Sequence, residues 1–268
     1  MQKLRALLLL LLSTSTSTGA GAEPPLRVFD QPTAERLGRE LFEQERRVAI
    51  ASDLVGENFD IEAEHIVGYI TSGDPQHLVV RYLRRVEQHY EAAVDALFAN
   101  LLLPTLQVPS DPALTPAQTA QAAARGQVAA DVSSRCDGRY NTLVVPDPDG
   151  KRMLVYAIAD SADPAKLMLG GHVRFTFSAD GQDLESAEPL ATSCTAGPRK
   201  LLQEAADTHG EAGLSVRNLL ATTPLESQVL LSLLYDLPLF VVTSDLKMWE
   251  VAQGKMRVVR DQPGPTTP

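Results

Sequence analysis

Two polar side chains on one predicted strand, His172 and Arg174, are the residues whose types and spacing could do chemistry. They lie in the segment 166–181 ("KLMLGGHVRFTFSADG"), where apolar and polar residues alternate. This alternation predicts a strand with both side chains on the face away from the core. An imidazole and a guanidinium there could bind a ligand together with Tyr140 and Asn141 of a neighbouring predicted strand, and the glycine pair before His172 would allow a close approach. A polar face that meets only solvent explains the same pattern, so the sequence leaves both interpretations open.

The two cysteines of the chain, Cys136 and Cys194, are expected to form a disulfide. In an exported chain, one bond between the two thiols is the simplest pairing. A reactive thiol is the alternative, but neither cysteine has a histidine nearby in the sequence or a CxxC partner. The pairing therefore stands as a structural prediction.

The sequence contains no motif that indicates a metal site, a cofactor site or a catalytic residue. The evenly spaced His65, His77 and His89 invite a metal site, but on one continuous helix the last two would stand roughly 18 Å apart. The chain has no GxSxG, HExxH or GxGxxG motif, no phosphate-binding glycine loop and no complete calcium loop. We therefore expect no metal ion, no cofactor and no catalytic residue that a motif would mark.

The first residues of the chain, 1–22, have the pattern of an export signal. Lys3 and Arg5 precede a leucine run that is too short to span a bilayer, and a small-x-small cleavage pattern ends at Ala22. No later segment is long and apolar enough to span a membrane. The formal net charge of −10 argues against a nucleic-acid partner. We expect a soluble protein in the periplasm or outside the cell, with no membrane-spanning segment after signal removal.

The N-terminal region, 23–103, is predicted to be helical. An amphipathic helix over 32–56 has a regular apolar stripe that is interrupted once, at Gln44. A second helix is predicted over 76–103, because its apolar residues follow the same spacing. Between them, residues 61–71 suit either a helix or a strand, and periodicity cannot decide.

A proline-rich linker over 104–115 is predicted to separate this region from a helix and an antiparallel meander over 116–260. Thr115 begins a capping box for the helix, and Asp-Gly pairs mark hairpin turns between four strands after it. The segment 224–235 suits a helix or a strand, with a short helix favoured and a capping box expected at Thr223 and Glu226. Residues 261–268 read as a frayed tail. The sequence shows no internal repeat, and the fold class that it predicts is α+β.

The order of several short segments after the linker resembles a group of uncharacterised exported proteins from Gram-negative bacteria. The segments are "YNTLVV", "GGHVRF", "EPLATSC" and "PLFVVTSD" followed by "WEV". The resemblance covers mainly the part after the linker. It implies an exported protein with a strand meander, and the group has no activity to carry over to any residue.

The function that these observations favour is binding without catalysis. We expect an exported module that binds an unknown protein or small molecule through a sheet face or edge. The alternative is a hydrolase whose catalytic residues are dispersed along the chain, with His172 as the base.

Overall fold

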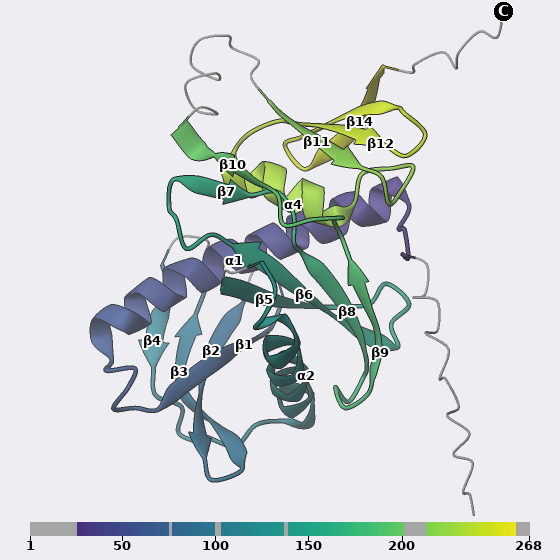
Figure 1. The fold of residues 1–268 in the computed structure, drawn as a ribbon. Coiled ribbons are helices and arrows are strands. Elements are labelled where there is room, and N and C mark those ends of the chain that lie inside the picture. The colour runs from purple at the N-terminus through teal and green to yellow at the C-terminus, as the bar shows by residue number, and fades with distance from the viewer. Residues whose placement is uncertain (1–25, 75–76, 100–102, 137–138, 201–212, 261–268) are drawn as a thin grey trace, which may run out of the picture.

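The protein has an α+β structure made of two units, each a helix followed by a sheet, and a C-terminal layer (Figure 1). The computed structural model describes residues 26–74, 77–99, 103–136, 139–200 and 213–260. The predicted export signal and the predicted tail lie outside the described residues. No helix within those ranges is long and apolar enough to cross a bilayer. The predicted fold class is confirmed.

The first unit is a long helix followed by a four-stranded antiparallel sheet in the order β1-β2-β3-β4. The helix begins where a side-chain oxygen of Asp30 accepts a hydrogen bond from the Thr33 N–H, at 2.9 Å. Its later turns pack on this sheet through Val48, Ala51 and Val55. The elements are α1 (Gln31–Asn58), β1 (Ile66–Ser72), β2 (Val79–Val86), β3 (His89–Leu97) and β4 (Thr105–Gln107).

The second helix predicted for this region, over 76–103, is wrong: the segment forms the hairpin of β2 and β3. Glu87, at a φ of 52°, and Gln88 make its turn. Over strands of only 8 and 9 residues, apolar residues match a period of two as well as one of 3.6, and the β-branched and aromatic residues favour a strand. Arg81 and Asp95, which a helix would have placed in solvent, pair across the two strands with N–O distances of 2.7 Å.

The segments before and after this hairpin, 61–71 and 104–115, each contain a strand. The ambiguous stretch 61–71 resolves into a turn followed by β1. Within the predicted linker 104–115, residues Thr105–Gln107 form β4 and pair with β3. The first part of the linker therefore belongs to the sheet of the first unit.

The second unit repeats this topology with a shorter helix. The predicted capping box is confirmed, since the Thr115 hydroxyl accepts from Gln118 N–H and the Gln118 side chain accepts from Thr115 N–H. The sheet is the predicted antiparallel meander, in the order β5-β6-β8-β9. The elements are α2 (Pro116–Val132), β5 (Arg139–Pro146), β6 (Arg152–Asp160), β8 (Val173–Ser178) and β9 (Leu184–Pro189).

The segment 166–181 is not one strand, contrary to the prediction. Its first residues form β7 (Lys166–Met168), which pairs with β10 (Ala196–Pro198) in a separate two-stranded sheet. The chain then breaks over 169–172 before β8 begins. The glycine pair lies in this break, so the change of direction occurs where the sequence is most permissive.

The C-terminal layer is a four-stranded sheet with one helix beneath it. The strand order is β11-β12-β13-β14, and β11 runs parallel to β12 because α4 connects them. Gln253 and Gly254 form the β13–β14 turn, both at positive φ. The elements are β11 (Leu214–Asn218), α4 (Glu226–Tyr235), β12 (Leu239–Thr243), β13 (Met248–Ala252) and β14 (Lys255–Arg260).

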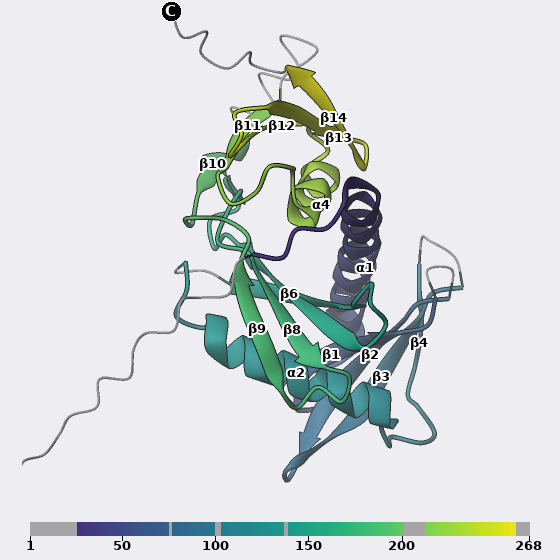
Figure 2. The same cartoon turned by 90° about the vertical axis from the view of Figure 1, so that its right-hand side faces the viewer.

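The short helix favoured for 224–235 is confirmed as α4, but its cap is not the predicted one. The helix begins after Leu225, whose N–H donates to the side-chain oxygen of Gln228 at 2.8 Å. The strand β11 was missed, since its five residues alternate too briefly to stand out. In Figure 2, α1 and α4 lie between the C-terminal sheet and the β5–β9 sheet, with α2 on the other side of that sheet.

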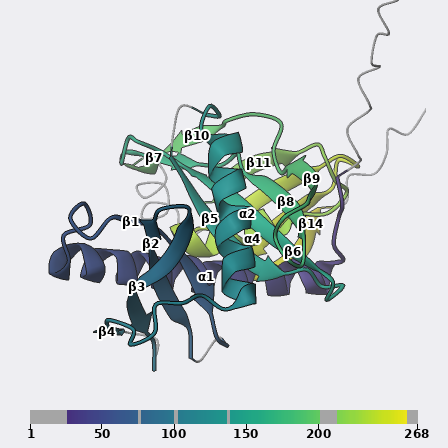
Figure 3. The same ribbon diagram turned by 90° about the horizontal axis from the view of Figure 1, so that it is seen from below.

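The helix of each unit forms hydrogen bonds with the first strand of the other unit. The side-chain amide of Gln44 on α1 donates to the Val144 carbonyl and accepts from its N–H, both at 2.9 Å, at the free edge of β5. In the same way, Gln121 on α2 bonds the N–H and carbonyl of Thr71 at the edge of β1, at 3.2 and 2.9 Å. Each helix therefore seals the open edge of the other unit's first strand, and Figure 3 shows α2 alongside both sheets. We call these four residues the glutamine clasps. The topology is duplicated although the sequence shows no repeat.

Candidate functional site

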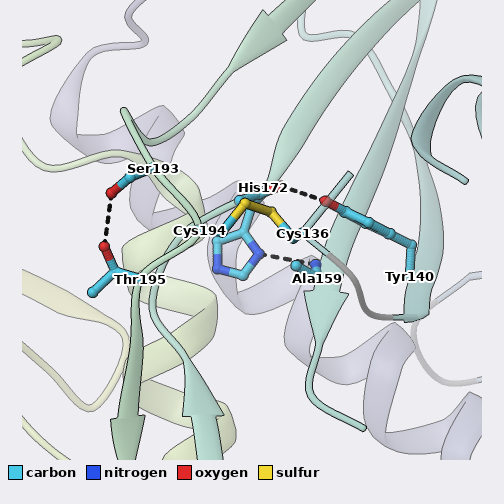
Figure 4. Close-up of a disulfide and its surroundings, with 8 residues drawn as sticks. Cys136, Tyr140, Ala159, His172, Ser193, Cys194 and Thr195 are labelled. Carbon is cyan, nitrogen blue, oxygen red and sulfur yellow. Dashed lines mark hydrogen bonds between the residues drawn. A yellow bond between two sulfur atoms is a disulfide. The ribbon is translucent and has the colours of Figure 1, made fainter. Parts of the chain in front are cut away.

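His172 is buried, which overturns the prediction that it points away from the core. Its side chain lies in the interior with 2% of the residue exposed. Nδ1 accepts a hydrogen bond from the Ala159 N–H at 3.1 Å, and Nε2 is buried without a hydrogen-bond partner (Figure 4). Burial lowers the pKa of His172 to about 4. The imidazole is therefore neutral near pH 7 and out of reach of a substrate.

The glycine pair before His172 makes room for the disulfide and not for a ligand. Cys136 and Cys194 are bonded as predicted, with their Cα atoms 5.4 Å apart. A Cβ on Gly171 would lie 2.4 Å from Cys136 Sγ, and Gly171 has a φ of +83°. A Cβ on Gly170 would lie 2.3 Å from the Ser193 carbonyl oxygen. Both positions require glycine because the disulfide and its loop pack directly on this backbone (Figure 4).

Arg174 is also buried, so the second part of the predicted binding face is wrong. Its guanidinium donates to Glu188 at 3.0 Å, to Glu226 on α4 at 2.5 Å and to the carbonyl of Arg27. Tyr156 donates a further hydrogen bond to Glu226 at 2.9 Å. Burial alone would lower the pKa of Arg174, but the adjacent Glu226 and Glu188 carboxylates raise it overall. This network joins the chain before α1, the β5–β9 sheet and α4, and its role is structural.

The face alternation along β8 was correct, but it could not show that both faces are covered. Val173, Phe175 and Phe177 pack against α2, as expected of the core face. The opposite face lies against α1, α4 and the C-terminal sheet, which bury it equally. A sheet that is covered on both sides cannot be distinguished from a half-exposed one by a period of two when its second face carries polar residues.

Tyr140 and Asn141 do not join His172 and Arg174 in one face. The Tyr140 hydroxyl donates to the Gly171 carbonyl at 3.1 Å, beside the disulfide. The Asn141 side chain turns the other way and donates to Glu45 of α1 at 2.7 Å. The four predicted site residues therefore lie in three different places: His172 and Tyr140 beside the disulfide, Arg174 between Glu188 and Glu226, and Asn141 against α1.

The most promising concave site is a cleft between the two units, which we call the α1 cleft. Its volume is about 620 Å³, and both glutamines of the clasps line it. Its apolar walls come from Leu78, Val144 and Pro146. Its charged side chains come from one face of α1 and from the turn after β1: Arg36, Arg39, Glu40, Glu43, Arg47 and Asp74.

Arg47 is the unusual residue of the α1 cleft. It is 2% exposed, its Nε is buried without a hydrogen-bond partner, and within the described part of the chain its nearest carboxylate oxygen belongs to Glu43, at 3.8 Å. Its guanidinium carbon lies 5.9 Å from the centre of the Phe98 ring. A buried guanidinium ordinarily has close carboxylate or carbonyl acceptors, because desolvation of the charge is costly. Here the compensation is weak.

The other cationic side chains on this part of α1 have closer partners. Arg36 pairs with Glu40 at 3.2 Å, and Arg39 donates to the Gly254 carbonyl at 2.7 Å. Burial raises the pKa of Glu40, against the opposing charge of Arg36. Arg47 is thus the one α1-cleft arginine, among the described residues, with no hydrogen bond to the protein.

A hollow of similar size under the C-terminal sheet offers less. Its volume is about 690 Å³, and it is lined in part by Glu250, Lys255 and Arg257. Those charges are already paired, Arg257 with Glu250 and Lys255 with Glu35 at 2.9 Å. No buried side-chain polar atom among its lining residues lacks a hydrogen-bond partner.

Sequence reasoning missed Arg47 and Glu45, although one signal was present. The apolar stripe of α1 is interrupted at Gln44, and the polar residues 44, 45 and 47 are all buried there. Polar residues on the apolar side of a helix indicate specific partners, but the sequence does not say which. Among the described residues, no group of three or more histidine, cysteine, aspartate or glutamate side chains is placed to hold a metal ion.

Comparison with known proteins adds no relative. No protein-family model matches the chain, and no curated protein and no solved structure is significantly similar to it.

Proposed function

We propose that the protein is an exported, non-catalytic binding module that holds a small organic anion with an apolar body in the α1 cleft. Export is supported by the leader pattern of residues 1–22 and by the disulfide between Cys136 and Cys194. The ligand class follows from the lining of the cleft, which joins an apolar wall to an under-compensated arginine. A pocket of this size is within the range of small-molecule sites.

The observation that carries the proposal is the burial of Arg47 without a close acceptor. A carboxylate, sulfonate or phosphate in the α1 cleft would supply the missing hydrogen bonds in the bidentate geometry that guanidinium favours. Leu78, Val144 and Pro146 would contact the apolar part of the same molecule. The base that the alternative hydrolase needs, His172, is buried and does not line the α1 cleft, so it offers that reaction no support.

A matched pair of fluorescent probes tests this proposal. 8-Anilinonaphthalene-1-sulfonate and N-phenyl-1-naphthylamine share one apolar skeleton and differ in the sulfonate. We expect the sulfonate to bind the wild-type protein saturably at one site and more tightly than the neutral probe. Arg47→Met keeps the apolar stem and should weaken sulfonate binding at least tenfold, about 1.4 kcal/mol, while leaving the neutral probe unchanged.

Arg135→Met is the control, because Arg135 is a partly exposed arginine that pairs with Asp131 outside the α1 cleft. It should leave both probes unaffected. Near-ultraviolet circular dichroism and the melting temperature establish that each variant is folded, since both probes also bind partly unfolded protein. Equal binding of the sulfonate to folded Arg47→Met and wild-type protein would refute the proposal.

A further inference from the structure

A second, smaller pocket lies beside α1, where that helix meets β5, β6 and α4. Its volume is about 210 Å³. Apolar contact comes from Ile158 and Leu234. The polar lining is Glu45, Asn141, Asp160, Arg199 and Tyr235. None of these five polar residues lines the α1 cleft, so the two sites are separate.

Glu45 is a buried carboxylate with unused hydrogen-bonding capacity. The residue is 8% exposed. Its Oε1 accepts from Asn141 Nδ2 at 2.7 Å, and its Oε2 is buried without a hydrogen-bond partner. Burial raises the pKa of Glu45 and the nearby charge of Asp160 adds to the rise, while the Asn141 hydrogen bond and the charge of Arg125 oppose it. A carboxylate oxygen left in this condition is costly unless a donor or a positive charge reaches it.

The cation that lines the pocket does not supply that charge. Arg199 directs its Nε to the Pro164 carbonyl, at 3.2 Å. No ion pair within 4 Å joins it to Glu45 or Asp160. The hydroxyl of Tyr235 is also committed, because it donates to the Met168 carbonyl at 2.9 Å. The pocket thus presents two carboxylates, one amide and apolar walls, with its donors directed elsewhere.

We propose that this pocket binds the ammonium group of a small organic amine, with Glu45 as the anionic partner and Asp160 adding negative charge at the mouth. An ammonium group has three donors and no acceptor, which suits an unfilled carboxylate oxygen beside a second acid. A divalent metal suits the site less well, because the pocket offers only two carboxylates. The volume of about 210 Å³ suits a small amine whose ammonium group reaches Glu45.

Calorimetric titration of the full chain with n-butylammonium, compared with n-butanol, tests the assignment. We expect saturable binding of the ammonium ion and none of the neutral alcohol at the same concentrations. Glu45→Gln keeps the size and a carbonyl acceptor for Asn141 but removes the charge, and should weaken n-butylammonium binding at least tenfold. Arg199→Gln removes a like charge from the exposed rim and should tighten binding two- to fivefold.

Glu57→Gln is the matched control, because Glu57 is an exposed glutamate near the end of the same helix, away from the pocket. It should leave the affinity unchanged, as should Arg47→Met in the α1 cleft. Equal affinity of Glu45→Gln and the wild type, binding of n-butanol as tight as that of the ammonium ion, or no saturable binding to the wild type would each overturn the assignment. Because Glu45→Gln removes a poorly solvated acid, it should fold at least as stably as the wild type, and its melting temperature checks this.

Discussion

The two helix-and-sheet units have the same strand order but differ in how their sheets are covered. The β5–β9 sheet lies between α2 on one face and α1, α4 and the C-terminal sheet on the other. The β1–β4 sheet is covered by α1 on one face, and its other face meets α2 only in part, through Ala122. Arginines on the strands of the two sheets therefore differ in burial. The side chain of Arg174 on β8 is fully buried, whereas that of Arg84 on β2 is 35% exposed. Whether a polar strand residue is buried or exposed depends more on which elements cover its sheet face than on the alternation along its strand.

The largest expected difference between the units concerns these two arginines. Arg174→Met leaves Glu226 and Glu188 buried without their partner, and should lower the free energy of unfolding by about 3–5 kcal/mol. Arg84→Met breaks a partly exposed pair with Glu91 at 3.6 Å and should cost about 0–1 kcal/mol. Urea unfolding of both variants measures the difference. Similar losses would show that the two sheets are equally buried in solution.

The next difference is in pH dependence, where His172 of the second unit contrasts with His89 of the first. The pKa of His172 falls from 6.5 to about 4 on folding, so between these values the unfolded chain binds more protons than the folded one. The stability that His172 contributes is complete above pH 6.5 and is lost as the pH falls towards 4, by roughly 3 kcal/mol. His172→Gln should flatten the stability profile over that range.

His89 is the control for this measurement, because its side chain is 60% exposed. His89→Gln should leave the shape of the profile between pH 4 and 6.5 unchanged. Chemical unfolding at half-unit pH intervals compares the three proteins. A wild-type profile that does not change when His172 is replaced would contradict a buried neutral imidazole.

The third difference contrasts two glycines. Gly171→Ala places a Cβ against Cys136 Sγ at a φ of +83°, and should cost roughly 2–3 kcal/mol. Gly68 of β1 has no atom within 4 Å of the position of an added Cβ. Gly68→Ala should therefore stabilise slightly, by about 0.5 kcal/mol, because glycine weakens a strand. Melting temperatures measured with the disulfide intact compare them, and a neutral Gly171→Ala would mean that the disulfide loop can move away.

The parts of the fold that were predictable from the sequence are those that local chemistry determines. The cap of α2 at Thr115 and the start of α1 near residue 32 each depend on a few adjacent residues, and both were correct. The hairpin of β2 and β3 was not predictable, because its turn at Glu87 and Gln88 carries no glycine and its strands match a helical period. There, pairing between strands overrides local preference.

The candidate sites were less predictable than the fold for the same reason. The disulfide was found because two cysteines allow one pairing. His172 and Arg174 were misplaced because segments distant in the sequence cover them. The disulfide lies beside His172 (Figure 4), and Glu226 of α4 and the chain before α1 contact Arg174. Arg47 and Glu45 are ordinary charged helix residues until packing removes their solvent and leaves them without full partners. Such residues become visible only when the tertiary contacts are known.

The glutamine clasps have a consequence for the integrity of the chain. An open strand edge invites pairing with another molecule, and here each edge is occupied by a side chain that belongs to the opposite half. If the two units separated, the backbone N–H and C=O groups of Val144 and Thr71 would lose their glutamine partners and become free to pair with another chain. Gln44 and Gln121 thus protect the edge strand of each unit against pairing with another molecule, as long as the two units stay together.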